Sequence, residues 1–319
     1  MRLRAGHTVA LCVLGLYLAV LLTGIAGVLN PYWQQIIGFA GIMTISALGL
    51  NVIYGYTGQF SLGHAAFYGI GAYTAAYITK SLHLGAWGLL PALLAGSTAA
   101  AAVAFLIGLP ILRLRSDYLG IATLGFGIIV KVMFDNADAV LPTLGGSRGM
   151  TGIPHLTTFT WVYLSVIAAV VLVRNFVYSS QGRACISVRE DEIAAEALGV
   201  DTTRYKTVGF VLGCALGGYA GGLYAHLYTF LHPMNFDFLK SLDVLLIIVL
   251  GGLGSISGTV IAACGWTLLL EGLRVVLPAR ILDWRLVIYP LLLIIVMLLR
   301  PKGLLGGNEL RFLKPKEKP

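Results

Sequence analysis

The residues that could do chemistry are concentrated in one charged run, Gln181–Lys206. The chain has 319 residues, of which 22 are Lys or Arg and 14 are Asp or Glu. Neither this run nor the rest of the sequence shows an enzymatic pattern. The whole sequence contains no Gly-Lys pair and hence no phosphate-binding loop. It also has no metal-ligand cluster, nucleophile elbow or paired catalytic carboxylates. We therefore expect a charged surface that binds another protein. The charged residues of the run are Arg183, Arg189, Glu190, Asp191, Glu192, Glu196, Asp201, Arg204 and Lys206.

Apolar residues recur within the charged run at a spacing near 3.5 residues, which predicts a short helix, Ile186–Gly199, with one apolar face. Gly199 is expected to end this helix, and Asp201 or Thr202 to cap the next one. A two-faced helix between membrane spans cannot lie in hydrocarbon, so we expect it at the membrane surface, docked on a partner protein. The apolar positions are Ile186, Ile193, Ala197 and Val200.

Composition indicates the setting of this helix. The chain is 58% hydrophobic and 11% charged, whereas soluble domains carry roughly 25% charged residues. The apolar runs are continuous, which favours an all-α polytopic membrane protein over a β-barrel with alternating strands. We interpret the net charge of +8 as Lys and Arg in cytoplasmic loops, not as a nucleic-acid surface. The four cysteines have no ligand spacing, and we expect neither a disulfide nor a metal site.

The hydropathy pattern predicts one transmembrane domain, residues 1–319, with about ten spans and both termini in the cytoplasm. The coupling segment covers about 181–206 and a basic tail covers about 300–319. The long Asp135–Thr158 connection is expected outside, either as a contact for an external partner or as a structural cover. The predicted spans are Thr8–Leu29, Gln35–Tyr54, Ala65–Ile78, Leu89–Leu112, Tyr118–Phe134, Phe159–Tyr178, Thr207–Phe230, a span from Leu242 that ends near Leu250, Thr259–Val276 and Arg285–Leu299.

Two glycine-rich segments share one pattern. Gly55–Ser61 and Gly251–Ser257 both read G-x-x-G-x-φ-S, where φ is apolar, and each joins two apolar helices. Paired interruptions suggest an internal repeat with broken helices that lines a translocation path; the alternative is a pair of simple tight turns. His64 is more typical of a packing histidine than of a proton relay. The candidate path residues are Asn51, Gly55, Gly58, Gln59, Ser61, Gly63, His64, Gly251, Gly254, Ser255 and Ser257.

Other intramembrane features have structural readings. The small residues of Gly213–Gly222 are expected to allow close helix contact. Asp243 and Glu271 are the remaining acidic residues within apolar runs, and we expect them near interfaces. No series of carboxylates follows the spans, which disfavours proton- or sodium-coupled transport.

Three segments together resemble a known family. Leu50–Tyr73 (LNVIYGYTGQFSLGHAAFYGIGAY), Arg189–Val200 (REDEIAAEALGV) and Gly251–Gly258 (GGLGSISG) are similar to permease subunits of bacterial ABC importers for branched-chain amino acids, in particular the M-type permeases of Liv systems. The resemblance covers nearly the whole chain. It implies a helical permease in the bacterial inner membrane that pairs with a second, homologous permease. It also implies two cytoplasmic ATPases and a periplasmic solute-binding protein as partners.

The resemblance also implies an ATPase-coupling loop with the pattern E-A-A-x-x-x-G. Ile193 stands at the Glu position, and Glu192, one residue earlier, is the candidate substitute. No cofactor is expected on this chain, because ATP would be used by the partner subunits. Related permeases carry urea, short amides or simple sugars, and a self-sufficient secondary transporter or channel is the alternative from another class. Whether the chain pairs with itself or with a homologue stays open. The coupling-loop residues are Arg189, Glu192, Ala194, Ala195, Glu196 and Gly199.

Overall fold

A computed structural model describes residues 15, 30–83, 85–112, 114, 116–276, 291, 294–295, 298–300, 302–306 and 309–310. The predicted first span, Thr8–Leu29, lies outside these residues except for Gly15. The predicted tenth span, Arg285–Leu299, and the basic tail lie mostly outside them.

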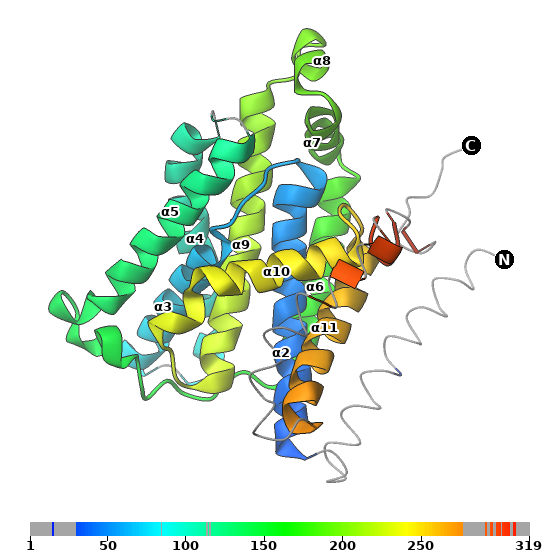
Figure 1. Cartoon of the computed structure of the whole chain (residues 1–319). Coiled ribbons are helices and arrows are strands. Elements are labelled where there is room, and N and C mark those ends of the chain that lie inside the picture. The colour runs from blue at the N-terminus through cyan, green and yellow to red at the C-terminus, as the bar shows by residue number, and fades with distance from the viewer. Residues whose placement is uncertain are drawn as a thin grey trace.

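The described part of the chain is helical, with one isolated backbone bridge (Figure 1). Six of its helices are long and apolar enough to cross a membrane, so the chain is a polytopic helical membrane protein. The elements are α2 (Pro31–Leu50), η1 (Asn51–Tyr56), α3 (His64–Ser81), η2 (Ala86–Gly88), α4 (Leu89–Ile111), α5 (Ser116–Asp135), η3 (Ala137–Ala139), η4 (Pro142–Leu144), η5 (Gly146–Arg148), α6 (Phe159–Val177), α7 (Ser180–Glu190), α8 (Glu192–Ala197), α9 (Thr202–Tyr228), η6 (Pro233–Phe236), α10 (Phe238–Gly251) and α11 (Ile256–Val276).

Each of the eight predicted spans that fall within the described residues is a helix, but α10 is short. Its 14 residues reach about 21 Å, less than the roughly 30 Å of a hydrocarbon core. Figure 1 shows α10 crossing the bundle obliquely to α2. Asp237 caps α10, because its Oδ1 accepts a hydrogen bond from Phe238 N at 2.7 Å. Lys240 lies in the first turn of α10.

Helices α2 and α9 form the centre of the bundle. The apolar window of Pro31–Tyr56 is 83% buried and that of α9 is 67% buried, against 22% for α5. Helix α9 packs against α2, α3 and α4. A Cβ added to Gly71 of α3 would lie 2.0 Å from the Gly218 carbonyl oxygen of α9, so the predicted close helix contact through Gly213–Gly222 is confirmed. Glycine gives this approach without a clash.

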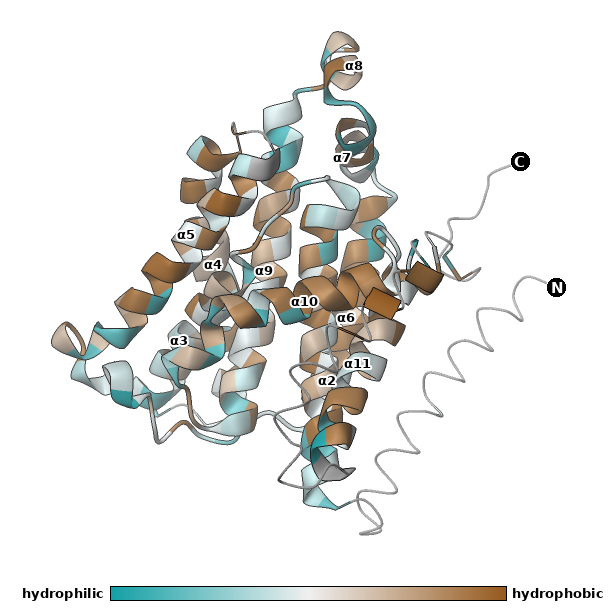
Figure 2. Ribbon diagram, in the orientation of Figure 1, coloured by the Kyte–Doolittle hydropathy of each residue, from teal (hydrophilic) through white to brown (hydrophobic). Residues whose placement is uncertain are grey.

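The peripheral helices expose apolar side chains, such as Leu106 of α4, Ile121 of α5 and Leu164 of α6. Figure 2 shows hydrophobic residues along α5 and α10 and hydrophilic residues gathered toward the ends of the bundle. This distribution is the one required of a surface in contact with lipid, because hydrocarbon has no partner for polar groups.

The two longest polar connections lie at opposite ends of the bundle (Figure 1). One end carries α7 and α8. The other carries the connection from α5 to α6, which contains η3, η4 and η5 and is tied to the rest of the fold. Met150 N donates to Leu231 O at 2.8 Å, and Leu231 N donates to Met150 O at 3.0 Å. Lys80 Nζ donates to Thr151 O at 2.8 Å. Placement at opposite ends supports the predicted alternation of the chain across the membrane.

Candidate functional site

The two glycine-rich segments, Gly55–Ser61 (the first break) and Gly251–Ser257 (the second break), lie against each other. Asn51, fully buried at the end of α2, joins them although it is 203 positions from Gly254. Its Oδ1 accepts a hydrogen bond from Gly254 N at 2.9 Å. Its Nδ2 donates to Ser255 O at 3.1 Å and to Thr259 Oγ1 at 2.9 Å. The amide thus satisfies three polar groups that would otherwise be buried without partners.

The backbone supports the sequence similarity between the breaks at one position. Gly58 has φ +73° and Gly254 has φ +76°, a left-handed conformation that glycine adopts without steric cost. The segments then diverge, because α11 begins at Ile256, two residues after its glycine, whereas α3 begins only at His64. The glycine turn is therefore the part of the pattern that repeats.

The first break begins within a turn of π-helix, η1, which contains Gly55. Thr57 Oγ1 donates to Val52 O and Ile53 O, both at 2.7 Å. Wider helical turns of this kind are frequent at functional sites. The Thr57 hydroxyl supplies hydrogen bonds to two carbonyls at the point where the helical ladder ends.

Gln59 and Ser61 of the first break are buried, and among the described residues their side-chain polar atoms have no hydrogen-bond partner. Gln59 is 2% exposed and lines a cavity of about 210 Å³ whose other walls include Leu119 of α5, Arg189 of α7 and Lys206 of α9. The structure therefore places a buried amide at a cavity between the first break and the charged segment.

Gly63 and His64 lie where the first break meets α3. A Cβ on Gly63 would lie 2.2 Å from Thr123 O of α5, so the chain passes close to that helix. His64 is fully buried, with Nε2 3.0 Å from Ser46 O of α2. Such a contact between ring and backbone is typical of a packing histidine.

The second break ends α10 at Gly251 and begins α11 at Ile256, with Ser255 fully buried between them. Glu309 caps the start of α11. Its carboxylate accepts hydrogen bonds from Ile256 N, from Ser257 N at 3.2 Å and from Ser257 Oγ at 2.8 Å. Tyr56 OH in η1 donates to the same carboxylate at 3.5 Å.

Glu309 is a site residue that the sequence analysis missed. The available signal was weak: one of two acidic residues in a basic tail, and a helix start without an acidic residue in its first turn. Because a helix N-terminus favours a negative charge, Glu309 both satisfies backbone donors and complements the helix dipole.

The charged run forms two helices, so the prediction of one helix over Ile186–Gly199 is wrong. Asp191 interrupts it with φ −157° and ψ 109°. Its Oδ1 accepts hydrogen bonds from Ile193 N and Ala194 N, both at 3.0 Å. An aspartate that bonds the amides two and three positions onward starts a new helix in preference to continuing the old one.

The expected helix boundaries after the Asp191 interruption are confirmed. Gly199 has φ +80° and follows the end of α8. Asp201 caps α9, because its Oδ1 accepts from Arg204 N at 3.0 Å.

The interruption also changes the expected apolar face. Ile186 packs toward the core, whereas Ile193 is 81% exposed and Leu198 is 86% exposed. Within α8 only Ala195 is buried, and Ala194 and Glu196 are exposed. Helix α8 and its C-cap residue Leu198 therefore present two large apolar side chains outward among charged neighbours.

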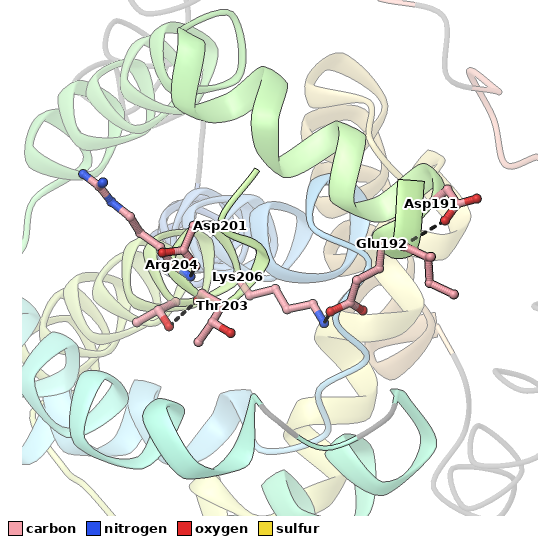
Figure 3. A network of polar contacts seen from close by, with 8 residues as sticks. Asp191, Glu192, Asp201, Thr203, Arg204 and Lys206 are labelled. Atoms are coloured by element: carbon pink, nitrogen blue, oxygen red, sulfur yellow. Dashed lines mark hydrogen bonds and ion pairs between the residues drawn. The ribbon is translucent and has the colours of Figure 1, made fainter. Parts of the chain in front are cut away.

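A polar network holds α7 and α8 to the start of α9 (Figure 3). Lys206 Nζ lies 2.5 Å from Glu192 Oε1, and the figure shows the two side chains meeting between the helices. In α7, Cys185 is buried and its Sγ donates to Tyr205 O at 3.4 Å. Burial raises the pKa of the Cys185 thiol to about 11, so the thiol stays protonated and can donate.

Arg189 connects α7 to the breaks. Its Nη1 donates to Gly55 O at 2.5 Å, while Nε donates to Glu190 Oε1 at 3.1 Å. Arg189 is expected from the sequence in the coupling loop, and the structure brings it together with residues of the candidate path.

The charged residues Glu271 and Arg274 of α11 and Lys240 of α10 make contacts that are separate from those of the charged run. Glu271 accepts a hydrogen bond from Tyr32 OH at 3.2 Å and lies 3.6 Å from Arg274 Nη1. Lys240 Nζ lies 4.6 Å from the centre of the Phe39 ring. Among the described residues, no group of three His, Cys, Asp or Glu side chains could hold a metal ion.

A bundle of apolar helices with interrupted segments and a charged surface segment defines a membrane-embedded transport subunit. Residues 32–297 match the family described as branched-chain amino acid transport system / permease component, and the chain belongs to this family.

Its relatives include both kinds of Liv permease. The chain is 36% identical to the high-affinity branched-chain amino acid transport system permease protein LivM of Salmonella typhimurium, over 83% of this chain and 68% of LivM. It is 27% identical to LivH of Escherichia coli, over 82% of this chain and 91% of LivH. It is also 27% identical to BraD of Pseudomonas aeruginosa, over 87% and 97% of the two chains. No solved structure matched the chain at a significant level.

Proposed function

We propose that this chain is the permease subunit of an ABC importer that carries branched-chain amino acids across the bacterial inner membrane. The observation that carries the proposal is the family match over residues 32–297, with relatives named as LivM and LivH permeases of high-affinity branched-chain amino acid transport systems. Because the chain is similar to both kinds, a second, homologous permease is the proposed membrane partner.

The energy for transport would come from two cytoplasmic ATPase subunits, with no cofactor bound to this chain itself. The absence of a phosphate-binding loop from the sequence supports this division of labour. The exposed Ile193 of α8 and its C-cap residue Leu198 supply apolar contacts for an ATPase groove, and Glu192 and Glu196 supply the charged rim. A periplasmic solute-binding protein would deliver the solute to the opposite face.

The translocation path would pass the two glycine breaks. Freed backbone groups and a buried amide such as that of Gln59 supply polar contacts in an otherwise apolar bundle. A solute with a small zwitterionic head and an aliphatic side chain suits such surroundings. Nucleotide binding would favour one of two arrangements of the paired permeases through the contacts of α8.

The direct test is reconstitution of the chain with the proteins that co-purify with it in mild detergent. Vesicles that hold the complete complex should take up labelled leucine, and uptake should require ATP and the solute-binding protein. Vesicles that hold this chain alone should show no flux.

Competition by unlabelled isoleucine, valine, urea and acetamide identifies the substrate class. Inhibition by the amino acids alone supports the proposal, and inhibition by urea or acetamide assigns a different substrate. Flux through the isolated chain would replace the proposal with a self-sufficient transporter or channel.

A further inference from the structure

We infer that Arg189 is the positioning residue through which the α7–α8 segment controls the two glycine breaks. The inference rests on the proposed function and names the atoms that would transmit movement from an ATPase to the translocation path.

The contacts of Arg189 reach both breaks. Its Nη1 donates to Gly55 O at 2.5 Å. Its side chain also lies beside both left-handed glycines: a Cβ added to Gly58 would be 2.9 Å from Arg189 Cγ, and a Cβ added to Gly254 would be 3.0 Å from Arg189 Nη1. One side chain from α7 thus occupies the space that these two turns leave by having no side chains of their own.

The opposite edge of the guanidinium is held within the coupling segment. Both Nε and Nη2 contact Glu190 Oε1, with the Nε distance at 3.1 Å. A planar group with five donors can bind a carboxylate on one edge and a carbonyl on the other. Glu190 lies directly before the Asp191 interruption. A change in the angle between α7 and α8 would therefore move Glu190, whose carboxylate orients the Arg189 guanidinium.

Asn51 completes the connection between the breaks. It bonds Gly254 N, Ser255 O and Thr259 Oγ1, so a shift of the turn around Gly55 is passed to the start of α11. The path from the exposed surface of α8 to both broken helices therefore consists of hydrogen bonds between Glu190, Arg189, the η1 turn and Asn51. The residues of this path come from three separate parts of the chain: α7, η1 and the segment from Gly254 to Thr259.

The test compares Arg189→Ala, Arg189→Lys and the unaltered chain in the complete reconstituted complex. Two quantities are measured: solute molecules imported per ATP hydrolysed, and the maleimide labelling rate of a Leu253→Cys reporter in a background without other cysteines. Leu253 is exposed in the second break and makes none of the contacts above. Labelling is recorded without nucleotide and with the ATPases trapped by vanadate.

We expect Arg189→Ala to assemble and to hydrolyse ATP within about twofold of the unaltered rate, while solute imported per ATP falls at least fivefold. The vanadate-dependent change in Leu253→Cys labelling should be lost. Arg189→Lys should recover part of both quantities, because an ammonium can donate to Gly55 O without binding Glu190 in the same plane. The matched control is Lys131→Ala on α5, since Lys131 pairs with Asp135 within its own helix and lies outside the charged run. This variant should leave both quantities unchanged.

The inference is overturned if Arg189→Ala imports as much solute per ATP as the unaltered complex, or if the labelling change persists. If Arg189→Ala does not assemble, the same comparison is made with Arg189→Lys and with Glu190→Ala. Full solute import per ATP in both of these variants would contradict the inference. The proposed function fails separately, if the unaltered complex shows no ATP-dependent uptake.

Discussion

Asn51 is the single residue on which the contact between the breaks depends most directly. A buried amide whose hydrogen bonds are all made rigidifies its surroundings, but removal of the amide leaves its buried partners unsatisfied. Here Asn51 bonds to Gly254, Ser255 and Thr259, of which Ser255 and Thr259 are fully buried. The residue could be singled out from the sequence as a rare polar group in an apolar run, but its partners could not.

Asn51→Ala should therefore destabilise the protein by about 1–3 kcal/mol, the cost of leaving buried polar groups unpaired. We expect a lower unfolding temperature in detergent and reduced leucine uptake. Asn136→Ala is the matched control, because Asn136 is exposed and bonds only Val132 O within its own turn. Equal unfolding temperatures for the two variants would show that the Asn51 contacts contribute nothing.

Cys185 offers a test of pH dependence at the same scale. Burial raises the pKa of its thiol to about 11, above the value near 9 that the thiol has when exposed. Because the thiol pKa is higher in the folded protein, the stabilisation that comes from keeping the Cys185 thiol protonated is complete below pH 9. It is lost as the pH rises toward 11.

At pH 8, iodoacetamide should alkylate Cys185 at least tenfold more slowly in the folded protein than in protein unfolded by detergent and urea. Mass spectrometry of the peptide that contains Cys185 measures the rate. Comparable rates in the two states would contradict the buried position of the thiol.

At the scale of elements, Asp191 decides that the charged segment is two helices. The apolar spacing alone predicts one, because Ile186, Ile193, Ala197 and Val200 fit a helical period. Asp191 offers the same backbone a cap worth about 1 kcal/mol. Ile186 packs on the core on one side of Asp191, and Glu192 pairs with Lys206 on the other. Together these contacts make two helices more stable than one.

Asp191→Ala should remove the cap and loosen α8 by about 1 kcal/mol, with faster proteolysis within residues 191–200 and weaker retention of the ATPase subunits. Asp191→Asn is the control, because asparagine caps equally well. Limited proteolysis and co-purification measure the two effects. If Asn and Ala substitutions behave alike, the carboxylate charge and not the cap is the important property.

Gly199→Trp tests the end of the same element. A tryptophan at φ +80° is strained by about 1 kcal/mol, and its ring would crowd the exposed surface of α8. ATP-dependent leucine uptake should fall at least fivefold while expression and membrane insertion stay normal. Unchanged uptake would remove α8 from the coupling surface.

At the scale of the whole molecule, the arrangement of the ends predicts which compartment each one faces. The α7–α8 end and the α5–α6 connection lie on opposite sides of the bundle (Figure 1). Since Lys and Arg concentrate in cytoplasmic loops, we propose that α7 and α8 face the cytoplasm and the α5–α6 connection faces the periplasm; the cytoplasmic placement of the two termini stays a prediction.

Single-cysteine labelling tests this orientation. Ile193→Cys, in α8, should react with a membrane-impermeant maleimide in inside-out vesicles but not in intact spheroplasts. Val140→Cys, in the α5–α6 connection and 82% exposed, should show the reverse pattern. The opposite result for both positions would invert the topology and place α8 out of reach of a cytoplasmic ATPase.

The sequence by itself determined the class of protein, the positions of most helices, the glycine interruptions and the caps at Gly199 and Asp201. These depend on hydropathy, glycine conformation and hydrogen bonds within a few residues, all of which a local pattern records. Only the tertiary structure decided that the interruptions touch, that Arg189 reaches both and that Glu309 caps α11. Those contacts join groups between 52 and 203 positions apart, and their geometry depends on how closely the helices pack, which no single segment specifies.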